Sequence, residues 1–367
     1  MVATGVFLVV SGVSFSLFSQ HQALLSTQQE TVGLSIGLRN ALAQIQLDVA
    51  NAGNGLILGT NVPAWPVGVT IINNTLVASQ CNPTATYPPA YVAACYDQLN
   101  IIVVDPNTPA IHPCATNGCS MSTSTGNTAN GLPAAVINPA TGVPYTSAQL
   151  ASHFNLGDQV LFVQSCSGGG HPNGSNGCMF TTALLTSVGT TTTLAPGCAT
   201  GCVSLNFTST GAGGTNSSAN DPLGMTTANV PAALLTDTFG QGDWVVRLLP
   251  ITYSVNASNV DSGNQPDPQL IRTQAGTQNA VMDQVIGFKV GAALWNAANS
   301  TSNFQYDYNA SDYASQYNLI RSVRVSIIGR TEPNPTNPFR NPFDSGPYQI
   351  RGSSIIVDPR NLTMNND

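Results

Sequence analysis

Side chains able to do chemistry are sparse in this chain, and their spacing forms no recognisable active-site motif. The four histidines are His21, His112, His153 and His171, and none lies in a metalloprotease, nucleophile-elbow or phosphate-loop pattern. His153 and Asp158 flank a turn and are the nearest approach to a catalytic pair, but we favour ordinary turn residues there. The sequence therefore predicts a protein that is not an enzyme and that needs no cofactor.

Oxygen ligands gather in one short segment, DSGNQPDPQ, at residues 261–269. Asp261, Asn264 and Asp267 are candidate calcium ligands, because carboxylate and amide oxygens crowd a single turn. Their spacing does not match an EF-hand loop. We therefore favour a cluster of Asx turns, in which the side chains bond to the nearby backbone, over a metal site.

Eight cysteines fall in close pairs within the middle of the chain, and two pairs bracket the polar loops CATNGC and CATGC. A zinc site is the alternative, but CxxC spacing is missing and the nearby histidines fit no ligand pattern. We expect disulfides that staple these loops, which implies an oxidising compartment. Sequential pairing is our preference among about 105 possible arrangements. The predicted disulfide cysteines are Cys81, Cys95, Cys114, Cys119, Cys166, Cys178, Cys198 and Cys202.

The overall composition excludes several classes of partner. Charged residues make up only 7% of the 367 residues, and the formal net charge is −7. No basic cluster is present, so the sequence predicts neither a nucleic-acid site nor a polybasic membrane-surface segment. With so little charge, the surface must be built from Asn, Thr, Ser, Gln and Gly, which favours strands and long polar loops over a large helical domain.

The chain begins with an apolar run, and its first charged residue is Glu30. Residues 1–18 would span roughly 27 Å as a helix, which is marginal for a bilayer. A secretory signal peptide would need a basic start and a clear cleavage site, and a buried core helix does not explain the amphipathic continuation. We expect this segment to be compatible with lipid, through Val2, Val6, Phe7, Leu8, Val9, Val10, Val13, Phe15, Leu17 and Phe18.

The helical pattern continues without a proline beyond the apolar run. One apolar stripe recurs at spacings of three and four residues, which predicts an amphipathic helix that packs on a globular head. Asn51 and Gly53 then provide stop signals. We therefore predict one helix of about fifty residues, roughly 75 Å long, with a head-packing stripe of Leu34, Leu38, Leu42, Ile45 and Val49.

Strand patterns fill much of the remaining sequence. We predict strands at residues 96–106 and 159–164, a β-hairpin at 179–195, and five further strands after residue 240 that fit one antiparallel sheet. Pro250 predicts an edge or a bulge in the first of these five. Arg321, Arg324 and Arg330 share one strand; a partner surface is possible there, but we favour a solvated face.

Two sets of segments together resemble a known family. They are the N-terminal stretch MVATGVFLVVSGVSFSLFSQHQALLSTQQE…LRNALAQIQLDVANAGNG, and the ordered segments LGDQVLFV, RLLPITYSV, PQLIRTQAG, DQVIGFKVG, IRSVRVSIIGRT and YQIRGSSIIVDPRNL. The chain resembles minor pilins of the PilW kind, within the type IV pilins and pseudopilins. The resemblance covers the helix and most of the last third strongly, and residues 56–240 patchily. Each segment is short, so their order carries the likeness.

The resemblance implies an α+β pilin-like fold, in which a long N-terminal α-helix packs on an antiparallel β-sheet head with disulfide-closed loops. It divides the chain into a helix at 1–52, with 1–18 in the membrane or filament core and 19–52 amphipathic, a loop-rich part of the head at 53–240, and a sheet part at 241–367. Family members begin with a basic leader that prepilin peptidase removes after a glycine, followed by a glutamate-bearing stretch. Met1 falls just after the position of that glutamate, as if the start were assigned too far downstream or the segment were trimmed.

The resemblance also implies a function. We expect a structural minor pilin that is assembled into a type IV pilus or primes one, with other pilin subunits, the inner membrane and the pilus assembly machinery as partners. The expected location is a single pass of the inner membrane with a periplasmic head, and then the pilus outside the cell. The alternatives are a type II secretion pseudopilin, a membrane-anchored secreted adhesin or carbohydrate-binding protein, and a secreted hydrolase.

Overall fold

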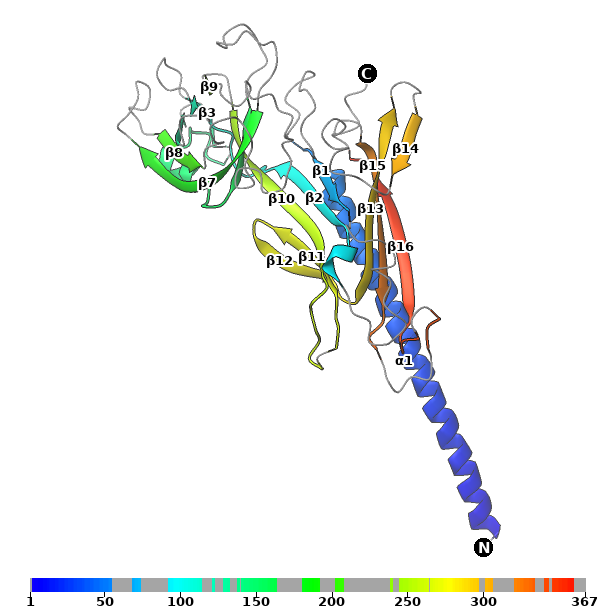
Figure 1. The fold of residues 1–367 in the computed structure, drawn as a ribbon. Coiled ribbons are helices and arrows are strands. Elements are labelled where there is room, and N and C mark those ends of the chain that lie inside the picture. The colour runs from blue at the N-terminus through cyan, green and yellow to red at the C-terminus, as the bar shows by residue number, and fades with distance from the viewer. Residues whose placement is uncertain are drawn as a thin grey trace.

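The computed structural model of the protein describes residues 2–54, 68–73, 92–113, 121–122, 128–132, 137–138, 140–163, 180–191, 202–207, 238–239, 244–263, 265–296, 301–305, 320–333, 340–342 and 345–359. A long N-terminal helix lies along a head of antiparallel strands, and its N-terminal end projects well beyond the head (Figure 1). The predicted α+β class and the long helix are both confirmed.

Helix α1 spans Val2–Ala50, and the short helices are η1 (Ala93–Cys95) and α3 (Ser147–Ala151). The strands are β1 (Val69–Ile72), β2 (Gln98–Val104), β3 (His112–Pro113), β4 (Met121–Ser122), β5 (Thr128–Leu132), β6 (Gln159–Val163), β7 (Phe180–Thr191), β8 (Cys202–Phe207), β9 (Thr238–Phe239), β10 (Trp244–Asn256), β11 (Gln269–Gln274), β12 (Thr277–Met282), β13 (Val285–Asn296), β14 (Thr301–Gln305), β15 (Ile320–Arg330) and β16 (Ile350–Val357).

Helix α1 ends where the chain meets the head. Gly53 has a φ of 74°, a left-handed conformation that glycine adopts readily at the end of a helix. Its N–H donates to the carbonyl of Ile102 in β2 at 2.8 Å. A Cβ on Gly68 would lie 2.4 Å from the Gly53 nitrogen, so glycine is needed at 68 for the chain to pass this close. The last turn of α1 is thereby fixed to the sheet.

The head contains two main sheets rather than the single predicted one. The larger has the order β1-β2-β10-β6-β7-β8-β5-β3, with β11 paired to β10 and β12 paired to β11, and the smaller has the order β14-β13-β15-β16. A two-stranded sheet of β4 and β9 completes the set among the described residues. The expectation of one sheet after residue 240 is therefore corrected, because β10 and β11 belong to the larger sheet and β13, β15 and β16 to the smaller.

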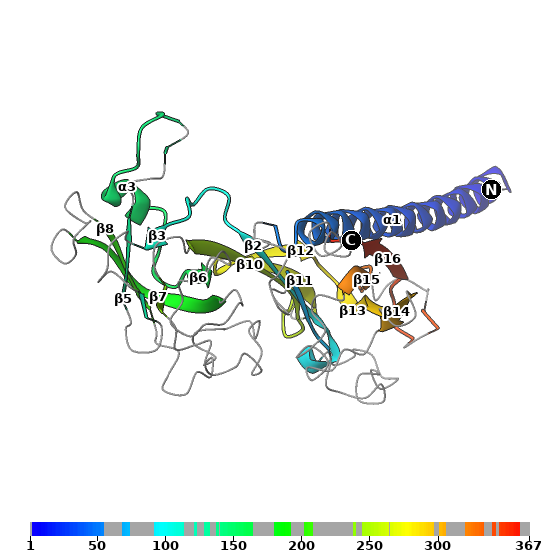
Figure 2. The ribbon, with the colours of Figure 1, turned by 90° about the horizontal axis from the view of Figure 1, so that it is seen from above.

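The long strand β10 explains this arrangement. It pairs with β2 on one side, and with β6 and then β11 on the other. Since β2 and β6 precede residue 240, the expected boundary between 53–240 and 241–367 runs through one sheet. Seen from above, the larger sheet extends away from α1 toward β7 and β8, while the smaller sheet stays beside the helix (Figure 2).

Strand β7 corrects a second expectation. The predicted hairpin at 179–195 is one continuous strand, Phe180–Thr191. Its first half pairs with β6 and its second half with β8, and the register shifts between Leu185 and Ser187. The strand therefore changes neighbours instead of reversing direction, which alternating apolar and polar residues alone do not distinguish. The predicted strands at 96–106 and 159–164 are present as β2 and β6.

The main core lies between α1 and the two sheets. Leu34, Leu38, Leu42, Ile45 and Val49 are all buried in it, together with residues of β2, β10, β13 and β15. Burial of each such side chain contributes about 1.5–3 kcal/mol relative to exposure. A second, smaller core lies beneath α3, where Leu150 and Phe154 pack on Val160, Leu185 and residues of neighbouring strands. The head is thus built on two apolar centres, and the helix belongs to only one of them.

A buried carboxylate joins the two sheets. Asp97, just before β2, accepts a hydrogen bond from the Val290 N–H of β13 at 2.8 Å and pairs with Lys289 at 3.1 Å. The Asp97 N–H donates to the Phe288 carbonyl. These contacts hold the start of β2 to the middle of β13, so the smaller sheet and the larger one share a fixed junction beside the helix.

Candidate assembly surface

The N-terminal half of α1 exposes large apolar side chains over most of its circumference. Phe7, Leu8 and Phe15 each keep more than two thirds of their surface exposed, at 71%, 71% and 75%. Successive helical residues are turned by about 100°, so the exposed positions 7, 8, 10, 13, 15, 17 and 18 lie over roughly 220° of the circumference, and Gly5, Gly12 and Ser16 lie in the remaining arc. The exposed apolar residues in this half are Phe7, Leu8, Val10, Val13, Phe15, Leu17, Phe18, Leu24, Leu25 and Val32.

Such a surface is unstable in water, because the free energy of exposing apolar area is about 25 cal/mol per Å². Of the side chains predicted to pack in a membrane or filament core, those of Val2, Val6 and Val9 lie outside the described residues. The other seven, named above, are exposed. A helix that is apolar over so wide an arc must be covered by lipid or by other protein.

No helix in the part of the chain that the structure describes is long and apolar enough to cross a membrane.

Polar side chains in the middle of α1 bond within the helix itself. The Thr31 hydroxyl donates to the Thr27 carbonyl at 2.8 Å, and the Ser35 hydroxyl donates to the Thr31 carbonyl at 2.9 Å. The Ser26 hydroxyl donates to Glu30 at 3.3 Å. Hydroxyls that bond back to the preceding turn need no water. The polar residues between the exposed half and the buried half are therefore compatible with a covered helix.

An ion-paired cluster fastens the last turn of α1 to the head. The Arg272 Nε of β11 lies 2.7 Å from the Asp48 Oδ2, its Nη2 lies 3.2 Å from Oδ1, and the Tyr253 hydroxyl of β10 donates to Oδ2 as well. The side chains of Asp48 and Arg272 are 13% and 16% exposed. Burial and the bond to Asp48 raise the pKa of Tyr253, and the same carboxylate raises the pKa of Arg272. Tyr253 therefore stays neutral and Arg272 stays charged in this cluster.

The sequence analysis did not predict this cluster, although the sequence contains one signal that could have indicated it. Asp48 is an acid near the C-terminal end of a helix, where the helix dipole disfavours negative charge. An acid at such a position indicates a cationic partner outside the helix. The partner, Arg272, lies 224 residues further along the chain, so only the fold could identify it.

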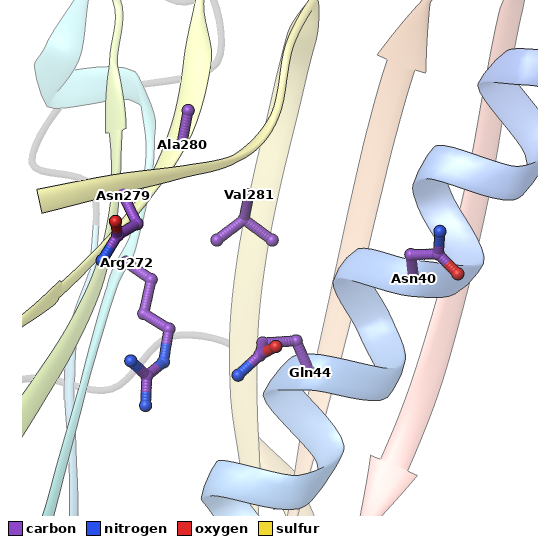
Figure 3. A pocket seen from close by; sticks show the side chains of 6 residues that line it. All are labelled: Asn40, Gln44, Arg272, Asn279, Ala280 and Val281. Atoms are coloured by element: carbon purple, nitrogen blue, oxygen red, sulfur yellow. The ribbon is translucent and has the colours of Figure 1, made fainter.

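Beside the cluster, a pocket of about 370 Å³ separates α1 from the β11–β12 hairpin. Asn40 and Gln44 face it from the helix, and Arg272, Asn279 and Val281 face it from the strands (Figure 3). The Arg272 charge is already satisfied by Asp48, and its Nη1 donates to Gln274 at 2.7 Å. The remaining polar groups are neutral amides, which supply neither a nucleophile nor a general acid or base.

The His153–Asp158 pair forms part of a structural network. Asp158 pairs with Arg247 at 2.7 Å, and Arg247 also contacts Asp105 at 3.1 Å and donates to the His153 carbonyl at 3.0 Å. The His153 ring makes an edge contact with Tyr145, with centroids 5.7 Å apart. Each charge of the cluster is engaged in holding β2, β6 and β10 together, and no hydrogen bond joins the His153 and Asp158 side chains in the described part of the chain.

The calcium candidates occupy the turn before β11. The Asp261 Oδ1 accepts from the N–H groups of Gly263 and Gln265, both at 2.8 Å, as in an Asx turn. Asp267 accepts from the Gln284 N–H and the Asn259 amide, and burial raises its pKa. Asn264 lies outside the described residues. No cluster of three metal-binding side chains occurs among the residues that are described.

Most of the predicted disulfide cysteines cannot be placed. Cys95, at the end of η1, is disulfide-bonded. The side chain of Cys202 and all of Cys81, Cys114, Cys119, Cys166, Cys178 and Cys198 lie outside the described residues. The pairing therefore stays a prediction.

Arg330 is buried, which corrects the expectation that it lies on a solvated face of its strand. Its side chain is 2% exposed, its Nε donates to the Gln284 side chain at 2.7 Å, and its guanidinium lies over the Tyr348 ring, 4.7 Å from the centroid. It also donates to the Pro266 carbonyl. Arg321 and Arg324 are half-buried. Ile320, Val323, Val325 and Ile327 are buried.

Comparison with known proteins adds little. No protein-family model matches the chain, and no curated protein matches it. Among solved structures, a type IV-like pilin from Thermus thermophilus is similar over 59% of this chain and 93% of its own, at 12% sequence identity and a TM-score of 0.20. Agreement at this level is too weak to carry an argument about family or function.

Proposed function

We propose that this chain is a non-catalytic, pilin-like structural subunit, and more narrowly a minor pilin of a type IV pilus. The observation that carries the proposal is the division of α1. The C-terminal, anchored half buries its stripe from Leu34 to Val49 against the head, and the N-terminal, projecting half extends from the head with apolar side chains exposed over most of its circumference. A subunit built in this way associates with others through the projecting helix, while the head remains at the surface of the assembly.

The projecting half suits helix–helix packing in an assembly. It carries Gly5 and Gly12, at which a Cβ would meet nothing within 4 Å, so the helix surface is open at both positions. Small residues let neighbouring helices approach closely where no water is present. Residues 2–29 contain no charge, so no buried ion would need a partner in the centre of a helical bundle.

The same surface supports the proposed location. Before assembly, the projecting half lies in the inner membrane with the head in the periplasm, and after assembly it lies in the filament core. The partners would be the helices of other pilin subunits and the pilus assembly machinery. The predicted disulfides fit the oxidising compartment that this path requires. A type II secretion pseudopilin shares every one of these features and stays the alternative.

The proposal is tested by incorporation into filaments. The tagged chain, joined behind the leader of a type IV prepilin, is expressed in a piliated host, and sheared pili are probed for the tag. We expect the unaltered chain in the pilus fraction and Phe15→Glu absent from it, because a carboxylate at this position would lie among apolar helices. Phe15 is 75% exposed in the single chain. The melting temperature of the head should therefore be unchanged.

A matched control is Arg39→Glu, on the exposed face of the anchored half. It changes charge on the same helix and should still be incorporated. If Phe15→Glu enters pili as well as the unaltered chain does, the projecting helix is not the assembly surface. If the unaltered chain stays in the membrane fraction while the host assembles pili normally, the minor-pilin proposal is wrong.

A further inference from the structure

The outer edge of β12 has no strand beside it among the described residues, because β12 pairs with β11 alone. The β11–β12 turn consists of Ala275 and Gly276, whose φ values of 48° and 78° are typical of a two-residue type I′ turn. Gln274 and Thr277 pair directly across this turn. In such a hairpin the pair next to the turn exchanges both main-chain hydrogen bonds, and the next pair exchanges none.

This alternation determines which main-chain groups of β12 face outward. Gln278 and Ala280 lie opposite Thr273 and Ile271, in the two pairs that exchange no hydrogen bonds. Thr273 directs its own main-chain groups to the other side of β11, where it pairs with Thr252 of β10. The N–H and carbonyl groups of Gln278 and Ala280 therefore point away from β11. They offer two donors and two acceptors to a further strand.

The edge of β12 lacks the features that usually prevent further pairing. Natural edge strands commonly carry charged residues or proline. The sequence of β12, TQNAVM, contains neither, and its first four residues are exposed. A bulge at Val281 interrupts the ladder at the other end of the strand, since Ile271 pairs with Ala280 and Leu270 pairs with Met282. The edge that can accept a strand is therefore short.

The pocket between α1 and the β11–β12 hairpin borders this edge. Ala280 contributes to the lining, although its side chain points to the opposite side of β12 from that of Val281 (Figure 3). The pocket therefore meets the main chain of Ala280. Asn40 and Gln44 line the helix side, one turn and about 6 Å apart. Main-chain groups on one edge of an extended peptide repeat every two residues, at about 6.6–6.8 Å, so both walls match its spacing.

The walls of this pocket offer free hydrogen-bonding groups and no free charge. In the described part of the chain, no hydrogen bond engages the side chains of Asn40, Gln44 or Asn279, and all three residues are exposed to an incoming ligand. A carboxamide can donate and accept at once, as a peptide group does. Arg272 is paired with Asp48 at 2.7 Å. A charged ligand group would therefore find no counter-charge in the lining.

We propose that this groove binds an extended peptide segment with small, uncharged side chains, which adds to β12 as a further strand. The peptide main chain would pair with Gln278 and Ala280 on one edge and with the carboxamides of Asn40 and Gln44 on the other. In strand addition, main-chain hydrogen bonds supply the affinity. The proposal does not rest on the assembly function, because no residue of the projecting half of α1 lines the pocket.

Calorimetric titration of the detergent-solubilised full chain, in about 0.15 M salt, tests the proposal. The probe is acetyl-Thr-Val-Thr-Val-Thr-amide, and we expect it to bind with a Kd on the order of 1 mM or tighter. The same peptide with every peptide nitrogen methylated should bind at least about tenfold more weakly, because it has lost its main-chain donors. Acetyl-pentalysine amide should also bind at least about tenfold more weakly, because its charges have no partners in the groove.

Ala280→Pro removes one outward N–H from the edge. Because this N–H makes no bond to β11, proline should change the melting temperature little and lower the affinity for the probe at least about tenfold. Absence of probe binding, equal binding of either other peptide, or unchanged affinity in Ala280→Pro would each overturn the proposal.

Gln44→Ala tests the helix side of the groove without touching β12. It should weaken probe binding about threefold or more, since one carboxamide partner is lost. Gln46→Ala, at an exposed position on another face of α1, is the matched control and should bind as the unaltered chain does. If Ala280→Pro lowers the melting temperature, Gln44→Ala decides the matter, and affinity equal to that of Gln46→Ala would overturn the proposal.

Discussion

The two halves of α1 have similar side chains and opposite surroundings. Leu24 and Leu25 in the projecting half are each 56% exposed, whereas Leu38 and Leu42 in the anchored half are each 3% exposed. Both pairs belong to one unbroken helix of 49 residues. The difference lies in the partner: β12, β15 and β16 lie against the anchored half, and the projecting half extends beyond the head (Figure 1).

This difference indicates that one half of the helix serves folding and the other serves association. The anchored half uses its apolar stripe for folding, so substitutions there should change the stability of the head. The projecting half uses a wide apolar surface for association, so substitutions there should change assembly and leave the head unaffected. Three substitutions test the anchored side of this comparison, complementing Phe15→Glu on the projecting side.

Leu38→Asp should have the largest effect. It places a carboxylate in the main core, and we expect the free energy of unfolding to fall by about 3–5 kcal/mol. The matched control is Ile36→Asp, two residues away and 51% exposed, which should cost less than about 1 kcal/mol. Thermal unfolding of the detergent-solubilised full chain measures both. Equal melting temperatures for the two variants would contradict the packing of the stripe on the head.

Arg272→Met should have an intermediate effect. It leaves the Asp48 carboxylate with Tyr253 alone, and we expect a loss of about 2–3 kcal/mol, below the value for a fully buried pair because both side chains retain some exposure. Arg39→Met on the exposed face of α1 is the control and should change little. Denaturant unfolding gives both values. A loss no greater than that of Arg39→Met would mean that the cluster does not fasten the helix.

Gly37→Ala should have the smallest effect and the opposite sign. The nearest atoms to a Cβ at 37 belong to Met282 at 3.9 Å, which is ordinary contact, so alanine should raise the stability by about 0.5–1 kcal/mol through its better helix propensity. Gly329→Ala should lower it, since its Cβ would lie 2.8 Å from Leu34 and 2.6 Å from Met282. A loss of stability in Gly37→Ala would show that the helix packs more tightly on β12 than the structure indicates.

The helix was predictable because its signals are local. The absence of proline, the stripe from Leu34 to Val49 and the stop at Asn51 and Gly53 all lie within a few turns of the residues that they govern. The strands were predictable one at a time for the same reason. The grouping of the strands into sheets was not predictable. β10 pairs with β2, which lies more than a hundred residues earlier in the chain, and the alternation of residues within a strand does not determine which strands it pairs with.

The exposed apolar surface of α1 was also partly predictable from the sequence. An apolar run without charge predicts a helix that needs cover, and the sequence placed this run at residues 1–18. The structure extends the exposed apolar surface further, to Leu24, Leu25 and Val32. The reason is geometric: the head begins to cover the helix at Leu34, and where a head begins is a property of the sheets and not of the helix.

By itself, the sequence determined the α+β class, the single long helix, the face that this helix buries, and the near absence of chemically reactive side chains, because each depends on residue type and short-range spacing. Only the tertiary structure decided the split into two sheets and the Asp48–Arg272–Tyr253 cluster. These features join residues far apart in the chain, and their formation depends on which strands pair. That choice is settled by packing over the whole head and is not encoded in any one segment.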